Sequence, residues 1–170
     1  IKLFEQHPEL KADILASLIN IAVTDEDHLN DDSIEKNMKD LLELITNNTI
    51  KDPVTAIGIV TAYARMLLHK NAFDQTALNI FKYLNGDESV LSDIPNENIR
   101  ALISTYKISI SQTALIDIQK ELAGIYVTNK GVKDYDNAKL LLVSIRDNSL
   151  STIEQKISAR IALLDIVIDQ

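Results

Sequence analysis

The 170-residue chain contains no cysteine and no tryptophan. The missing cysteines exclude a disulfide scaffold, a thiolate zinc site and a cysteine nucleophile. Aromatic residues make up only 5% of the chain, too few to build a stacking platform for single-stranded nucleic acid. No apolar run approaches the roughly 18 to 20 residues that a membrane span needs, so no span is expected within this segment.

Basic residues are scarce relative to acidic ones. The chain has 17 Lys and Arg residues against 25 Asp and Glu residues, which gives a formal net charge of −8 at pH 7. This charge opposes non-specific attraction to nucleic acid or to an anionic membrane surface. We therefore expect no direct contact with nucleic acid.

Glycine and proline, with 4 and 3 residues, are too rare for a β-sandwich or barrel, which needs frequent turn signals. Apolar residues instead recur with a period of 3.6 residues almost everywhere, which predicts an all-α chain of about eight helices. The length suits one domain, 1–170, which we expect to be part of a longer chain. The expected helix ranges are 8–23, 33–46, 53–69, 71–84, 95–106, 111–128, 134–146 and 151–170.

Capping signals mark several of these boundaries. Asp52–Pro53 suits a helix start, because proline lacks the N–H that the first turn leaves unpaired. Asn85–Gly86 suits a helix end, because glycine accepts the left-handed conformation that closes a helix.

Other boundaries rest on a serine or an asparagine. Ser33 is expected to cap the second helix, and Asn71 is expected to start the fourth. Ser151 with Glu154 predicts a capping box for the last helix.

Apolar spacing assigns a stripe to the first helix and an inner side to the fourth. The stripe of the first helix consists of Leu10, Ile14, Leu18 and Ile21. The inner side of the fourth consists of Phe73, Ala77, Leu78, Phe81 and Leu84.

The three prolines suggest a repeat of helix pairs. Pro8, Pro53 and Pro95 each open an expected helix, and each is followed by a second helix before the next proline. Their separation of roughly 42 to 45 residues is the length of a helix-pair unit in solenoid proteins. A bundle with prolines spaced by chance remains the alternative.

The sixth and seventh expected helices carry a more specific pattern. The order is leucine, small residue, tyrosine, a turn with glycine, then tyrosine, alanine and two large apolar residues. The residues at these positions are Leu122, Ala123, Tyr126, Tyr135, Ala138, Leu142 and Ile145. The third and fourth helices hold a more degenerate copy, made of Ala64, Leu67, Phe73, Ala77, Phe81 and Leu84.

This pattern resembles the tetratricopeptide repeat, in which small residues let two antiparallel helices approach closely. In both copies the turn between the two alanines is longer than in the family, and the family's final proline is absent. A generic antiparallel helix pair is the alternative. The resemblance implies a right-handed α-solenoid of about four antiparallel helix pairs.

In tetratricopeptide-like arrays the first helix of each pair lines a concave groove that holds a peptide or a partner helix. The resemblance places this partner-binding groove at Thr61, Arg65, Leu68, His69, Asp117, Lys120, Val127 and Thr128. A plain solvent-exposed helix face would have nearly the same composition.

The sequence offers little for catalysis or metal binding. The three histidines lie in different elements, and none pairs with another at metal-binding spacing. The acidic stretch 24–32 fails the calcium-loop template, because Asn30 replaces the glycine and Lys36 replaces the bidentate glutamate. No glycine-rich phosphate loop or nucleophile motif is present. We therefore expect no enzyme activity, no cofactor and no metal.

The last expected helix is apolar around almost its whole circumference, which is unusual for the polar outer cap of a soluble solenoid. Its residues Ile157, Ile161, Leu164 and Ile168 are predicted to form a docking surface for a partner or a second copy. Burial deep within the domain is the alternative.

These observations favour a non-catalytic scaffold or adaptor that binds a protein or peptide. Two alternatives remain, a peptide-sensing domain of a bacterial regulator and a membrane-anchored bacterial tetratricopeptide-like accessory protein. The composition does not determine the compartment; we favour the cytoplasm and keep the bacterial periplasm as the alternative.

Overall fold

The computed structural model describes residues 7–24, 31–46, 50–128 and 133–169. Within these ranges every regular element is helical and no strand occurs, which confirms the all-α prediction. The α-helices are α2 (Pro8–Thr24), α3 (Asp31–Thr46), α4 (Pro53–Lys70), α5 (Gln75–Leu84), α6 (Glu97–Tyr106), α7 (Gln112–Thr128), α8 (Tyr135–Asp147) and α9 (Ile153–Asp169). Two short 3-10 helices, η1 (Glu88–Asp93) and η2 (Lys107–Ser109), flank α6.

Two of the predicted boundaries are confirmed in detail. The Asp52 carboxylate accepts a hydrogen bond from the Thr55 backbone N–H at 2.7 Å, and Pro53 is the first residue of α4. At the other end of the helix pair, Asn85 closes α5 and Gly86 has a φ of 116°, a conformation that favours glycine.

One start that the proline spacing predicts is wrong. α6 begins at Glu97 instead of Pro95, because Asn96 provides the cap by accepting from the Ile99 N–H at 3.1 Å. Of the three prolines only Pro8 and Pro53 are the first residue of a helix.

Two further starts differ from the prediction. α5 begins at Gln75 instead of Asn71, because Asp74 provides the cap by accepting from the Ala77 N–H at 2.9 Å. Phe73 therefore precedes the helix and is 42% exposed, so its assignment to the inner side is wrong. α3 begins before Ser33.

The start of α9 also differs by one residue. The capping box is formed by Thr152 and Gln155, whose side chains exchange hydrogen bonds with each other's backbone N–H at 3.1 and 2.9 Å. Ser151 is buried, and its hydroxyl donates to the Ile145 carbonyl at 2.7 Å. The box predicted from Ser151 and Glu154 is therefore wrong.

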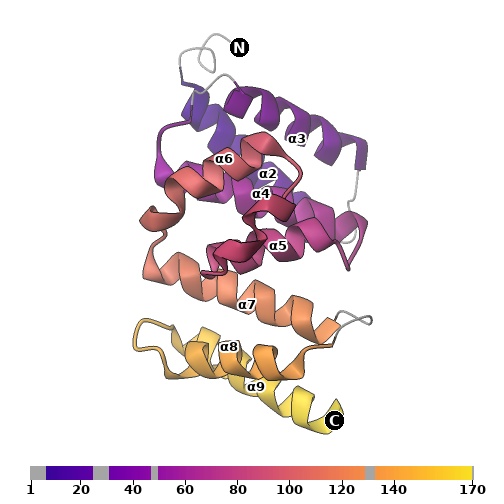
Figure 1. Ribbon diagram of the computed structural model, residues 1–170, viewed down its shortest axis with the longest axis vertical. Coiled ribbons are helices and arrows are strands. Elements are labelled where there is room, and N and C mark those ends of the chain that lie inside the picture. Colours follow the sequence, from indigo (N-terminus) through magenta and orange to yellow (C-terminus); the bar gives the residue numbers. More distant parts are fainter. Residues whose placement is uncertain (1–6, 25–30, 47–49, 129–132, 170) are drawn as a thin grey trace.

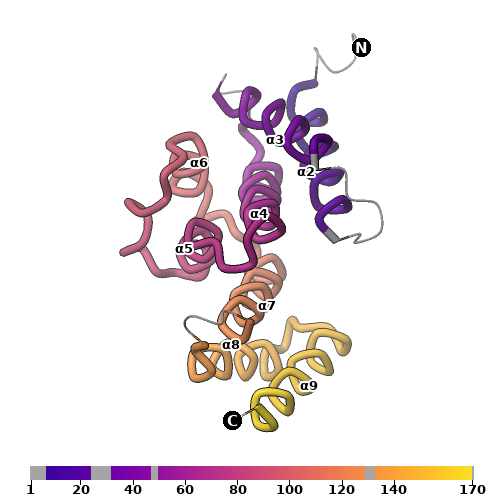
Figure 2. Tube along the Cα trace, turned by 90° about the vertical axis from the view of Figure 1, so that its right-hand side faces the viewer, coloured from indigo at the N-terminus to yellow at the C-terminus, as the bar shows by residue number. Residues whose placement is uncertain are grey.

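The helices form two connected parts along the long axis (Figures 1 and 2). α4 is the central helix of the first part and packs against α2, α5 and α6. In the second part α7 packs on α5, α8 on α7, and α9 on α8. α2 and α3 lie toward one end of the molecule and α9 lies at the other. Tyr126 and Leu141 pack against the buried residues of both parts and so connect the two apolar cores.

α7 and α8 form the helical hairpin that the sequence predicts. Ala123 and Ala138 are both buried and belong to the same apolar cluster, together with Leu142 and Ile145. The small alanine side chains permit the close contact of the two helices.

The stripe predicted for the first helix lies on its exposed face. Leu10, Ile14, Leu18 and Ile21 are between 39% and 61% exposed. The buried residues lie on the opposite face and are Ala12, Leu15, Ala16 and Ile19. Two alanines on this face allow α2 to lie close to its neighbours α3 and α4, which the larger side chains of the other face would prevent.

Candidate binding groove

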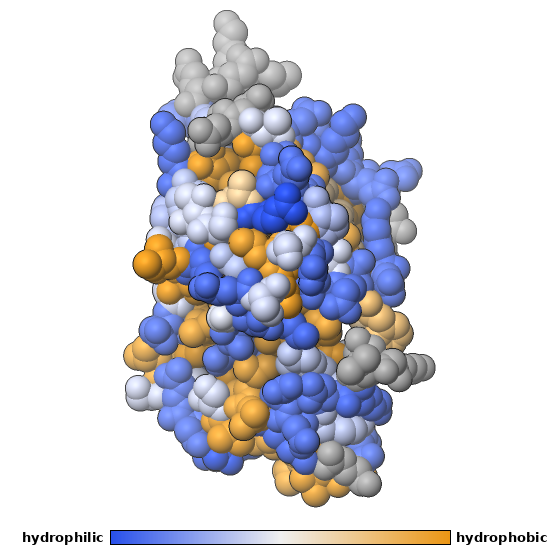
Figure 3. All heavy atoms as spheres, in the orientation of Figure 1, coloured by the Kyte–Doolittle hydropathy of each residue, from blue (hydrophilic) through white to orange (hydrophobic). Residues whose placement is uncertain are grey.

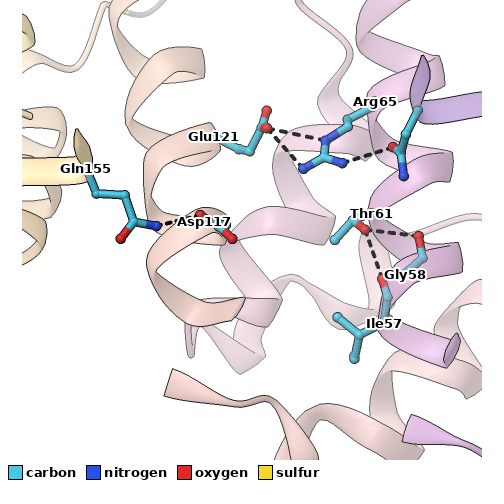
Figure 4. Close-up of polar contacts among 8 residues, drawn as sticks. Ile57, Gly58, Thr61, Arg65, Asp117, Glu121 and Gln155 are labelled. Atoms are coloured by element: carbon cyan, nitrogen blue, oxygen red, sulfur yellow. Dashed lines mark hydrogen bonds and ion pairs between the residues drawn. The ribbon is translucent and has the colours of Figure 1, made fainter. Parts of the chain in front are cut away.

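Polar side chains join α4 to α7 and to α2 on one face of the molecule. Arg65 on α4 contacts one carboxylate oxygen of Glu121 on α7, with distances of 3.3 Å from Nε and 3.2 Å from Nη2 (Figure 4). Its Nη1 donates to Oδ1 of Asn20 on α2 at 2.9 Å. One guanidinium group thus holds three helices in register.

A second polar contact continues this line to the last helix. Gln155 on α9 donates from Nε2 to Oδ1 of Asp117 on α7 at 2.9 Å (Figure 4). Asp117 and Glu121 are four residues apart and share one face of α7, so they reach the helices on either side of it. Such partly exposed contacts contribute only about 0–1 kcal/mol each, and their main effect is to fix the geometry.

A cleft of about 260 Å³ opens between α4 and α7, next to η2. Its walls are apolar and include Val54, Ile57, Phe81, Ile110, Ala114 and Ile118. Its polar margin includes Thr61, Arg65, Asp117 and Glu121. A Cβ atom built at Gly58, which also lines the cleft, would meet nothing within 4 Å, so a side chain there would project into open space.

Two further cavities lie along α7. One of about 230 Å³ lies between α7, α8 and α9, with Leu142, Ile145 and Ala159 among its apolar residues. A more open one of about 320 Å³ lies between the C-terminal halves of α4 and α7. Gly124 lines both, and a Cβ atom there would again meet nothing within 4 Å. We call the three cavities together the groove.

Most of the predicted groove residues lie in these cavities. Thr61, Arg65 and Asp117 line the first cavity, and Lys120, Val127 and Thr128 line the second. Leu68 lines the third. The remaining residue, His69, lines none of the three and is half-buried near the end of α4.

Sequence reasoning missed the apolar walls of the first cleft. On α7 the residues Ala114, Ile118 and Glu121 repeat at four and three positions, a signal that could have identified this face. Ser109 and Ile110 enter the site from η2 and the residue after it, and nothing in the sequence indicates that this segment turns toward α4.

The polar groups at the cleft have defined partners. The Thr61 hydroxyl is 3.0 Å from the carbonyl oxygens of both Ile57 and Gly58, so its proton is directed to its own helix (Figure 4). At the N-terminus of α4 the hydrogen bond from the Thr55 backbone N–H lowers the pKa of Asp52, and its bond from the Thr55 hydroxyl adds to this effect. The cleft therefore combines an apolar interior with a polar margin whose geometry is fixed.

Metal binding finds no support in the described ranges. Within them no group of three or more His, Asp or Glu side chains is arranged to hold a metal ion. The acidic stretch considered as a calcium loop lies largely at 25–30, outside the described residues.

The predicted docking surface lies on the outer face of α9. Ile157, Ile161, Leu164 and Ile168 are between 51% and 80% exposed, and apolar atoms gather at this end of the molecule (Figure 3). No helix in the described part of the chain combines the length and apolar character needed to cross a membrane.

Comparisons of the chain with protein-family models, with curated proteins and with solved structures find no match.

Proposed function

We propose that the chain is a non-catalytic protein-interaction domain that binds an extended peptide segment of a partner protein in the groove. The observation that carries this proposal is that Thr61, Arg65, Leu68, Asp117, Lys120, Val127 and Thr128 all line adjacent cavities along α4 and α7.

The packing order of the helices supports a tetratricopeptide-like arrangement. α4 pairs with α5 and α7 pairs with α8, while α5 also packs on α7 and α8 on α9. At these two junctions the second helix of one pair contacts the first helix of the next, as in a solenoid whose units contact only their neighbours. At the first junction α4 packs mainly on α2, the first helix of the preceding pair. We propose that α2–α3, α4–α5, α7–α8 and α9 form this array, and that α6 is an addition that packs back on α4 and α3.

The size of the first cleft favours a peptide side chain over a small-molecule ligand. Its volume of about 260 Å³ is below the roughly 300–1,000 Å³ of typical small-molecule sites. An apolar side chain of the peptide would fill the interior, and the polar groups of the margin would bond to the peptide backbone. Thr61, Asp117 and Glu121 offer oxygen acceptors there.

The test is selection of peptides from a random displayed library, followed by affinity measurement on variants. Gly58→Leu is the most informative variant, because Gly58 lines the cleft and a Cβ atom there meets nothing within 4 Å. We expect it to weaken the selected peptides at least about tenfold, the equivalent of about 1.4 kcal/mol. The α4 helix should remain intact, since leucine has a higher helix propensity than glycine.

The matched control is Ala101→Leu, which adds similar apolar bulk on an exposed position of α6, away from the groove. It should leave the affinity unchanged. Arg65→Glu is a poorer variant, because it would set a new carboxylate against Glu121 and disturb the contact between α4 and α7. Failure to select any peptide, or equal affinity of the Gly58→Leu and wild-type proteins, would contradict the proposal.

A further inference from the structure

α9 is buried on one face only. Ala159 and Ile166 are its buried residues and pack in the cluster that α8 and α7 share. The opposite face carries a stripe of large apolar side chains, each more than half exposed. This α9 stripe consists of Ile153, Ile157, Ile161, Leu164 and Ile168.

α2 has the same organisation at the other end of the helix stack. Its buried face contacts α3 and α4, and the opposite face carries the exposed stripe described above. This α2 stripe consists of Leu10, Ile14, Leu18 and Ile21. Each stripe therefore faces away from the helices on which its own helix packs, in the direction in which a further helix would stack.

The two stripes match in spacing. The steps along α2 are four, four and three residues, and the steps along α9 are four, four, three and four. Side chains at such steps form a continuous ridge on a helix. Two ridges of matching period can interdigitate along their length, which removes both apolar surfaces from water.

The charges beside the stripes favour an antiparallel pairing of α2 with α9. Successive residues advance by about 100° around a helix, which sets Asp13 on one side of the α2 stripe and Lys11 on the other. By the same rule Arg160 and Asp165 lie on opposite sides of the α9 stripe.

With the helices antiparallel and Leu10 opposite Leu164, Asp13 lies on the side of Arg160 and Lys11 on the side of Asp165. On each side of the contact between α2 and α9, a carboxylate then faces a basic side chain. In an antiparallel pair of two α9 helices, the Arg160 side chains of both copies would instead lie on the same side, where their like charges repel each other.

We propose that copies of this chain associate head to tail, with the α2 stripe of one copy packed antiparallel on the α9 stripe of the next. The contact is heterologous, because the two surfaces differ, so an open assembly of any length retains one free stripe at each end. The stack of helices would thus continue from one molecule into the next.

The experiment uses sedimentation velocity over a range of protein concentrations with two variants. Wild-type protein is expected to grow beyond a dimer as concentration rises. Ile14→Glu, which blocks the α2 stripe, and Leu164→Glu, which blocks the α9 stripe, should each be monomeric. Both positions are exposed, so the folds should persist, and circular dichroism checks this.

The decisive sample is an equimolar mixture of the two variants. Ile14→Glu retains a working α9 stripe and Leu164→Glu retains a working α2 stripe, so the mixture should form a one-to-one dimer and grow no further. Self-association of Ile14→Glu alone would instead reveal pairing of two α9 helices and would overturn the proposal. Wild-type protein that stays monomeric at all concentrations would overturn it as well.

A charge exchange checks the predicted orientation. Asp13→Lys should weaken the association, and Arg160→Glu introduced into the same chain should restore it, because the pair then has reversed signs. The absence of restoration would contradict the antiparallel register.

Discussion

α4 and α9 are helices of nearly equal length, 18 and 17 residues, and both are rich in apolar side chains. α4 packs against α2, α5 and α6 and buries eight of its residues, whereas α9 packs mainly on α8 and buries two. Burial deep within the domain was the alternative interpretation of the apolar circumference of α9, and α4 is the helix with that environment. Apolar composition alone therefore does not distinguish a central helix from a terminal one, because the number of neighbours decides how much of it is buried.

The largest expected effect comes from matched truncations in the two helices. Ile59 on α4 is fully buried, whereas Ile161 on α9 is 54% exposed. Ile59→Ala should cost about 2–5 kcal/mol of unfolding free energy, because it leaves a cavity in the core. Ile161→Ala should change it by less than about 0.5 kcal/mol, as at other exposed sites. Urea denaturation of both variants measures the difference, and equal costs would refute the contrast between the two helices.

The same contrast should appear in local stability. Ile166 is the largest buried side chain of α9, so Ile166→Ala should cost about 2 kcal/mol, the low end of the range for core isoleucines. Because α9 has one principal neighbour, we expect this loss to open α9 locally. Hydrogen exchange measured by mass spectrometry should show faster exchange in α9 and unchanged exchange in α4. Equal acceleration in both helices would indicate that the molecule unfolds only as one unit.

The capping of these two helices shows how far the sequence could predict the fold. Asp52–Pro53 is a strong local signal, and α4 begins where it predicts. Before α9 the sequence offers two overlapping capping boxes, Ser151 with Glu154 and Thr152 with Gln155. The local sequence pattern fits both capping boxes equally well. The choice depends on tertiary structure, because the Ser151 hydroxyl is buried against the Ile145 carbonyl and is not free to cap.

The groove likewise depends in part on tertiary structure that the sequence does not reveal. Most residues that the resemblance to helical repeats assigns to α4 and α7 line cavities of the structure, because residues three and four apart share one face of a helix. The contributions of Ile110 and Phe81 were not predictable, since they depend on where η2 and α5 pass relative to α4. The buried face of α2 was not predictable for a related reason: both faces of that helix are apolar, and only its neighbours select which one is buried.

The smallest expected effect distinguishes the two helix caps by pH. The cap of α4 is a carboxylate, whose pKa is lowered in the folded state by the Thr55 backbone N–H, whereas the cap of α9 is a hydroxyl that does not titrate in this range. A lowered pKa means that the unfolded chain binds a proton more readily than the folded one. The contribution of Asp52 to stability is therefore fully present above its unfolded pKa of about 3.9. It is lost as the pH falls through the folded pKa.

Asp52→Asn keeps an oxygen acceptor at the cap but removes the titration. We expect the wild-type protein to be more stable than this variant at pH 7, and the difference to shrink as the pH falls below about 4. Thr152→Ser serves as the matched control at α9, since it retains a hydroxyl cap and should give a difference from wild type that does not vary with pH. Urea denaturation across this pH range measures both. A wild-type advantage over Asp52→Asn that stays constant down to the lowest pH would show that the charge of Asp52 contributes nothing to the cap of α4.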